Sequence, residues 1–176
     1  MNIYIIGSLR NPNITNVSAA LRCAGHDVFD DWHAAGPEAD DYWQKYEQAR
    51  GRTYQEALKG EAAKNVFQFD KRHLDEADAA VLVAPAGRSG HLELGYMVGK
   101  RRPTAILVEA DPERWDVMYQ FAGAVCISID ELVQFFAPLV IAHPTAREME
   151  ELRKVPPMTH TNIQAGNYGV YGERVV

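Results

Sequence analysis

Residues 79–100 constrain the fold more than any other part of the sequence. The apolar run 79–83 is typical of a buried strand. Pro85, Gly87 and Gly90 then predict a loop, and the apolar residues that follow recur at helical spacing. A strand, a glycine-containing loop and a helix in this order are typical of α/β proteins, which bind ligands beyond the carboxyl ends of their strands.

The rest of the chain alternates in the same way. Strands are predicted over residues 2–6, 27–30, 79–84, 104–109 and 125–128. Helices are predicted over residues 14–23, 42–50, 53–77, 91–100, 113–122 and 131–136, and a polar loop over 31–41. The alternation predicts a doubly wound, flavodoxin- or Rossmann-like parallel sheet of about five strands flanked by helices. We expect residues 1–137 to form this domain. Residues 138–176 are expected to form a further helix and an irregular tail, either disordered or packed on a neighbouring subunit.

Composition excludes several classes of partner. The net charge of −6 argues against nucleic acids and anionic membranes, which bind clustered basic residues. No apolar run approaches the ~20 residues of a membrane span. Cys23 and Cys126 stand alone in apolar surroundings, which predicts buried, reduced thiols in a cytoplasmic protein and no metal site.

Glu93 has two interpretations. It follows Gly90 by three residues, the spacing of a capping box, so it is either a helix cap or a functional carboxylate in the predicted first turn. A helix N-terminus favours the ionised carboxylate. Such a group at the mouth of a crevice can attack an anomeric carbon and form a glycosyl-enzyme intermediate. Gly90 and His91 would then aim it.

Asp70 is the second informative carboxylate. The predicted helix 53–77 carries an apolar stripe that contains Leu58, Ala62, Val66, Leu74 and Ala77. Asp70 falls on that stripe, and burying a lone carboxylate is costly. We therefore expect either a buried partner or a place at a cavity edge, as a proton donor or hydroxyl-binding group. Tyr4, in the first strand, is expected in the core with a partner for its hydroxyl group.

The turn Gly7-Ser8-Leu9-Arg10 joins the first strand to the first helix. Helix-start N–H groups, the Ser8 hydroxyl and the Arg10 guanidinium suit a phosphate or carboxylate, although a plain tight turn also uses these residue types. Asp31 and Trp32, after the second strand, are candidates for contact with a planar base. His91 is either a loop cap or a ligand contact, and the histidines at 26, 73, 143 and 160 are expected at the surface.

These residues together resemble the nucleoside 2-deoxyribosyltransferase superfamily, which includes the 2′-deoxynucleoside 5′-monophosphate N-hydrolases. The resemblance covers about residues 1–136. It rests on the segment from Tyr4 to Arg10, on Asp70 eight residues before Asp78, and on Glu93-Leu94-Gly95-Tyr96.

The resemblance implies a role for each residue. Glu93 becomes the nucleophile, Asp70 transfers a proton to the leaving base, and Tyr4 lies near the nucleophile and the sugar. Ser8 and Arg10, in the Gly7–Arg10 turn, bind a 5′-phosphate, and this turn favours a nucleotide over a free nucleoside. Ser89 takes the place of a phosphate-binding serine at a shifted offset.

The expected activity is cleavage of the N-glycosidic bond of (2′-deoxy)nucleosides or their 5′-monophosphates, by hydrolysis or by base transfer. The resemblance implies no cofactor and a homodimer or larger homo-oligomer, in which the tail around 167–171 could complete a neighbour's site. Two alternatives stay open. One is a glycohydrolase of NAD or another ADP-ribose compound, and the other is a nucleotide-binding module in which Glu93 only caps a helix.

Overall fold

The five predicted strands form one parallel sheet in the order β2-β1-β3-β4-β5 in the computed structural model, which describes residues 1–108 and 115–140. The strands are β1 (Asn2–Ile6), β2 (Asp27–Phe29), β3 (Ala79–Val83), β4 (Thr104–Leu107) and β5 (Ala124–Cys126). The prediction of a doubly wound α/β fold is confirmed. The strand order is the flavodoxin-like one, whose switch point lies between β1 and β3.

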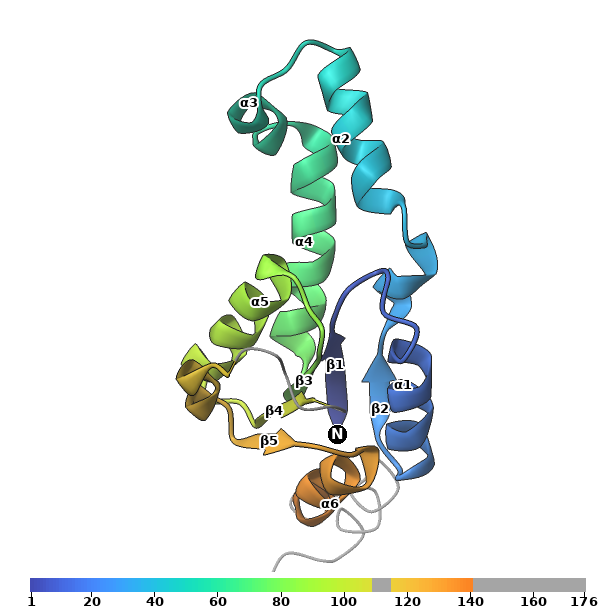
Figure 1. Cartoon of the computed structure of the whole chain (residues 1–176), viewed down its shortest axis with the longest axis vertical. Helices are drawn as coiled ribbons and strands as arrows, with labels where there is room; N and C mark the ends of the chain where they lie inside the picture. Colours follow the sequence, from blue (N-terminus) through green and yellow to red (C-terminus); the bar gives the residue numbers. More distant parts are fainter. Residues whose placement is uncertain (109–114, 141–176) are drawn as a thin grey trace, which may run out of the picture. The chain divides into compact units, whose positions relative to one another are not determined.

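Helices cover both faces of the sheet (Figure 1). The helices of the described ranges are α1 (Ile14–Cys23), η1 (Asp31–Ala35), α2 (Ala39–Ala49), α3 (Tyr54–Leu58), α4 (Glu61–Glu76), α5 (Arg88–Gly99), η2 (Val117–Phe121) and α6 (Ile129–Val140). The α1 and α6 helices pack on one face, and α4 and α5 pack on the other. No helix in the described ranges is both long enough and apolar enough to cross a bilayer.

The core follows from the alternation of side chains along the strands. In β1, Ile3 and Ile5 face α1 and α6, whereas Tyr4 and Ile6 face α4 and α5. All of β3 is buried, because a central parallel strand is covered on both faces. This explains why residues 79–83 read as one apolar run.

The region between β2 and β3 differs most from the prediction. The expected loop 31–41 contains η1 and the start of α2. The expected helix 53–77 is two helices, because Thr53 and Glu56 form a capping box for α3 and α4 starts separately after Gly60. Leu58 and Val66 are exposed, contrary to the predicted stripe. The first half of α4 stands beyond the carboxyl ends of the strands, together with α2 and α3, so it has no sheet to pack against (Figure 1).

Three smaller predictions are also corrected. Cys126 is buried as expected, but Cys23 is exposed on the last turn of α1. His26 is buried against the ring of Phe136, and His73 stacks on Phe29, so neither is a surface residue.

The end of the chain lies partly outside the description. The last predicted helix is longer than expected, because α6 starts at Ile129 and continues through Pro138. The chain divides into Met1–His143 and Pro144–Val176. The second unit, which holds His160 and the tail at 167–171, lies outside the described residues, as does His143.

Candidate active site

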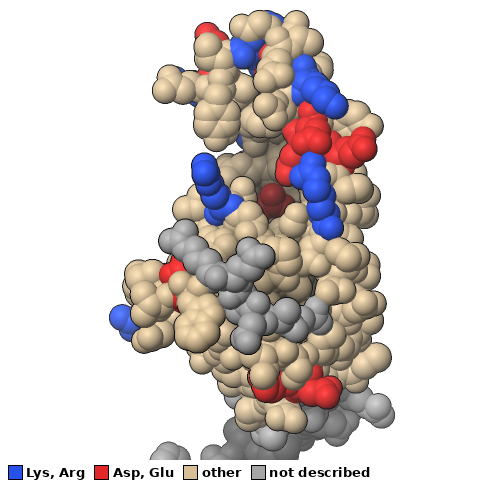
Figure 2. Space-filling model, in the orientation of Figure 1, with Lys and Arg blue, Asp and Glu red and all other residues tan. Residues whose placement is uncertain are grey.

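Tyr4, Asp70 and Glu93 come together from three elements. The middle of β1 supplies Tyr4, α4 supplies Asp70 and α5 supplies Glu93. The Tyr4 hydroxyl donates a long hydrogen bond to Asp70 Oδ1, at 3.4 Å. The sequence predicted a partner for the Tyr4 hydroxyl and a partner or a cavity edge for Asp70. This one hydrogen bond makes each residue the partner of the other. Figure 2 shows the face hollowed here, with an acidic group in its depth and charged groups of both signs at its rim.

Glu93 is a half-buried carboxylate without a cation. It accepts no hydrogen bond and forms no ion pair among the described residues. Burial first, and the charge of Asp70 second, raise the pKa of Glu93 to about 7. The site therefore holds Glu93 near the midpoint of its titration at neutral pH.

Asp70 and Tyr4 are shifted by the same environment. Burial raises the pKa of Asp70, opposed by the hydrogen bond from Tyr4 and the nearby His73, and the charge of Asp40 raises it further. Burial and the charges of Glu93 and Asp70 hold the pKa of Tyr4 well above its usual range, so its hydroxyl remains a hydrogen-bond donor. Several titratable groups with shifted pKa values in one cleft are typical of catalytic sites.

The position of Glu93 in its helix corrects the capping interpretation. Gly87 is the N-cap residue of α5 and Arg88 is its first residue, so Glu93 lies beyond the first turn. Gly90 is not a cap. It is buried where α5 crosses β1, and a Cβ there would come within 2.9 Å of Ile6 Cγ2. Gly90 thus lets α5 approach the sheet closely enough to bring Glu93 near Tyr4. The helix N-terminus does not keep Glu93 ionised.

A cavity of about 260 Å³ lies at the switch point between β1 and β3. The turn after β1 and the loop after β3 line it, through Ser8, Arg10, Asn11, Pro12, Pro85, Ala86 and Gly87. The predicted anion-binding residues Ser8 and Arg10 therefore face a real space beside the start of α5. Helix-start N–H groups at such a place suit an anion.

Asn11 is a residue of this cavity that the sequence did not single out. It is buried, its Nδ2 donates to the carbonyls of Val83 and Ala84, and its Oδ1 accepts from the N–H of Asn13. Asn11 ties the turn after β1 to the end of β3. Its place directly after the Gly7–Arg10 turn was the available signal.

The remaining candidates lie around this centre. Trp32 is half-buried under Gly7, and its indole N–H donates to the Ile5 carbonyl at 2.8 Å, so much of the ring is engaged in packing. Asp31 and Ser89 are exposed. His91 is held between the Gly87 carbonyl, at 2.8 Å, and the Tyr119 hydroxyl, at 3.1 Å. Its ring therefore faces η2.

A cluster of aromatic rings next to Asp70 was not predicted from the sequence. Phe29 of β2 stacks on His73 of α4 with ring centroids 3.8 Å apart, and Phe69 and Tyr4 also contact this pair of rings. Phe69 and His73 flank Asp70 on α4, which is the only signal that the sequence offered. These rings are better placed than Trp32 to offer a planar surface near Asp70.

Two other features do not belong to this centre. A hollow of about 780 Å³ runs along residues 65–76 of α4, but it is lined by that helix alone and excludes Tyr4, Asp70 and Glu93. Among residues 1–108 and 115–140, no group of three or more His, Cys, Asp or Glu side chains is arranged to hold a metal ion.

Comparisons with known proteins bear on the fold alone. No protein-family model matches the sequence, and neither does any curated protein. The structure is similar to that of a 2-deoxyribosyltransferase from Bacillus psychrosaccharolyticus, with a TM-score of 0.53 and 18% identity over 76% of this chain and 90% of that one. It is also similar to the CMP N-glycosidase BcmB from Clostridium botulinum, with a TM-score of 0.46 and 11% identity over 76% of this chain and 96% of that one.

Proposed function

We propose that this protein cleaves the N-glycosidic bond of 2′-deoxynucleosides or their 5′-monophosphates, and that water rather than a second base completes the reaction. The observation that carries the proposal is the pair Asp70 and Glu93, two half-buried carboxylates that face one cleft and form no ion pair with a cation in the part of the chain that the structure describes. Burying two unpaired carboxylates lowers the stability of the fold, and a pair of carboxyl groups is what most glycoside-cleaving enzymes use. The fold shared with a 2-deoxyribosyltransferase supports the choice of a nucleoside substrate.

The first step uses the two carboxylates in different roles. An oxygen of Glu93 attacks C1′ of the sugar, and the electron pair of the C1′–N bond goes to the departing base. Asp70 donates a proton to that base, so it leaves neutral. Tyr4, which already bonds Asp70, lies beside both groups and orients them.

The second step reverses the proton transfer. Asp70, now ionised, accepts a proton from water as the water oxygen attacks C1′. The bond from C1′ to Glu93 breaks, and the free carboxylate and the sugar are released. No cofactor takes part.

The shared environment of the pair gives the reaction a pH requirement. With its pKa raised to about 7, Glu93 is ionised in about half of the molecules at pH 7. Because the two carboxyl groups interact, they titrate as a pair. The reactive form has one proton, on Asp70, and in that form the charge of Asp70 no longer raises the pKa of Glu93. The rate therefore depends on how this single proton is shared.

The 5′ end of the substrate is assigned to the cavity at the switch point. Ser8, Arg10 and the start of α5 supply donors for a phosphate, and Ser89 is exposed on the first turn of that helix. Gly90 positions the helix against β1, and the ring of His91 faces η2, so neither side of the helix start is closed by them. This assignment favours a monophosphate over a free nucleoside. A homodimer or larger assembly is expected from the family resemblance.

Covalent trapping tests the proposal directly. A 2′-deoxy-2′-fluoroarabino-nucleoside or its 5′-monophosphate slows the second step, so the protein should gain the mass of the fluorinated sugar, and peptide mapping should place it on Glu93. Glu93→Gln should take up no label and lose at least about 10³-fold in base release. A label on Asp70 would reverse the two roles.

A substrate panel separates the rival functions. Deoxynucleosides, their monophosphates and NAD are each incubated with the protein, with and without an acceptor base. Free base without a new nucleoside identifies a hydrolase, and a new nucleoside identifies a transferase. Release of nicotinamide alone would favour the NAD alternative. Thermal stabilisation by nucleotides without turnover would overturn the enzymatic proposal in favour of a binding module.

A further inference from the structure

Arg10, the cation of the switch-point cavity, is already bonded to a carboxylate of its own chain. Its Nη2 donates to Asp41 Oδ2 at 2.8 Å, and the two residues are 31 positions apart in the sequence. Asp41 lies in the first turn of α2, outside the turn that holds Arg10. The ion pair therefore joins α2 to the edge of the cavity.

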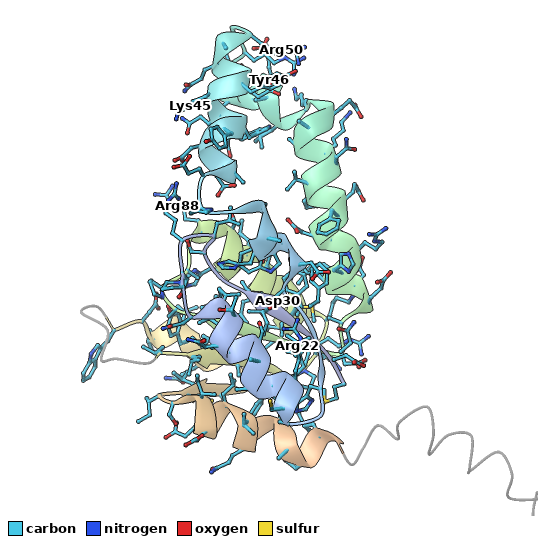
Figure 3. All side chains as sticks on the ribbon, turned by 90° about the vertical axis from the view of Figure 1, so that its right-hand side faces the viewer. Arg22, Asp30, Lys45, Tyr46, Arg50 and Arg88 are labelled. Carbon is cyan, nitrogen blue, oxygen red and sulfur yellow. The ribbon has the colours of Figure 1, made fainter. Side chains whose placement is uncertain are left out.

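Arg88 provides the contrast. It is the first residue of α5 and follows Gly87, which lines the same cavity. Among the described residues it forms no ion pair and no hydrogen bond, and its side chain is exposed. Figure 3 shows Arg88 projecting away from the ribbon, on the side where α2 starts. Of the two arginines at this place, one is engaged by an internal anion and the other is not.

We propose that Asp41 acts as an internal substitute for the 5′-phosphate: it holds Arg10 while the cavity is empty and gives it up when a phosphate group binds. This inference rests on the proposed function for its ligand. A carboxylate and a phosphate offer the guanidinium the same kind of paired oxygen acceptor. Asp41 thereby sets how strongly the site prefers a monophosphate to the corresponding nucleoside.

The exposure of the pair sets the size of the effect. The side chains of Arg10 and Asp41 are 54% and 48% exposed. Ion pairs in such positions are weak because water screens them, so a phosphate dianion displaces Asp41 at a cost of only about two- to fivefold in affinity. A pair this weak can exchange in every catalytic cycle, whereas a buried one would block the site.

Exchange of partners also affects α2. Asp41 is tied to the body of the protein through Arg10, so its release removes one contact between the first turn of α2 and the turn after β1. Amide exchange in that turn of α2 reports on the release without any reference to catalysis. We expect it to rise when a phosphate compound binds.

Calorimetric titration of Asp41→Asn tests the inference. The probes are inorganic phosphate, a 2′-deoxynucleoside 5′-monophosphate and the same nucleoside without phosphate. The ratio of monophosphate to nucleoside affinity should rise about two- to fivefold over the wild type, and phosphate affinity should rise with it. Amide exchange in the first turn of α2 should already be raised in the unliganded variant.

Two further variants keep the test specific. Asp40→Asn makes the same charge change one residue away, in a side chain that has no bond to Arg10, and should leave the ratio within about 1.5-fold of the wild type. Combining Asp41→Asn with Arg10→Ala should abolish the gain, because no guanidinium remains to be released. An equal gain in Asp40→Asn, or a gain that survives Arg10→Ala, would overturn the inference in favour of general repulsion.

The outcomes distinguish this inference from the proposed function. If phosphate binding responds to Asp41→Asn and no substrate releases base, the exchange stands and the glycosidase proposal fails. If base is released from nucleosides and phosphate compounds bind no better than nucleosides in both proteins, the glycosidase proposal stands and the exchange fails.

Discussion

Two glutamates of this protein, the buried Glu47 and the half-buried Glu93, differ in the charge of the side chain beside them. Glu47 of α2 is 3% exposed, and its Oε2 accepts a hydrogen bond of 2.9 Å from Arg52 Nη1. Glu93 of α5 is half-buried and faces a second carboxylate, Asp70, and forms no ion pair within residues 1–108 and 115–140. The first arrangement compensates the cost of burial, whereas the second increases it.

The difference separates the structural role of Glu47 from the functional role that we propose for Glu93. Glu47 and Arg52 join the end of α2 to the segment that leads into α3, and Gly60 leaves room for the guanidinium, since a Cβ there would lie 2.9 Å from Arg52 Nη1. No comparable ion pair holds Glu93 among the residues that the structure describes. A carboxylate held without compensation beside Asp70 and Tyr4 lowers stability, which is the pattern expected of a functional residue if the proposed function is correct.

The largest expected effect is on catalysis. Asp70→Asn should reduce base release from natural substrates by about 10²–10⁴-fold, because the base must then leave without a proton. A deoxyriboside with a 4-nitrophenolate leaving group needs no such proton, so its cleavage should fall less than tenfold. Steady-state kinetics on both substrates measures the difference. Equal losses of activity on both substrates would mean that Asp70 is not the acid. The contrast between the Glu93–Asp70 pair and Glu47 would then not reflect the proposed chemistry.

The next effect is on folding at the paired glutamate. Glu47→Ala should lower the free energy of unfolding by about 2–3 kcal/mol, because it leaves the partly buried Arg52 without its acceptor. Urea denaturation measures it, and Glu61→Ala, in an exposed pair with Lys64, should change stability by less than about 0.5 kcal/mol. A neutral result at Glu47 would mean that its ion pair contributes no more than a surface pair.

The smallest effect has the opposite sign. The pKa of Glu93 is raised in the folded state, so the folded protein binds the proton more tightly than the unfolded chain. The contribution of protonated Glu93 to the free energy of unfolding is therefore fully present below about pH 4.5 and is lost as the pH rises through about 7. Glu93→Gln removes this loss and should raise the free energy of unfolding at pH 8 by about 1–2 kcal/mol, after allowance for partial exposure.

Denaturation of Glu93→Gln and the wild type at pH 8 and pH 4.5 measures this effect, with the exposed Glu76→Gln as the control. The gain should be absent at the lower pH. A destabilised Glu93→Gln at pH 8 would show that Glu93 is compensated in the fold, like Glu47, and would contradict the proposed contrast.

The fold and most of the candidate site follow from local patterns. Apolar runs and helical spacing were sufficient for five strands and their order of alternation. Asp70 was conspicuous because a carboxylate interrupts an apolar stripe. Its partner Tyr4 was not identified by spacing, because the two residues are 66 positions apart.

The sequence by itself determined which residues are chemically unusual: a carboxylate within a repeat of apolar residues, a glutamate after a glycine loop, and an arginine in a strand-to-helix turn. Only the tertiary structure decided what surrounds them. Glu93 is not a cap, because α5 starts at Arg88, and its charge state is set by burial and by Asp70 rather than by a helix end. Arg10 is bonded to Asp41 because α2 starts where the sequence indicated a loop. Local patterns specify the elements, but pKa values and partners depend on distances between elements, which only packing determines.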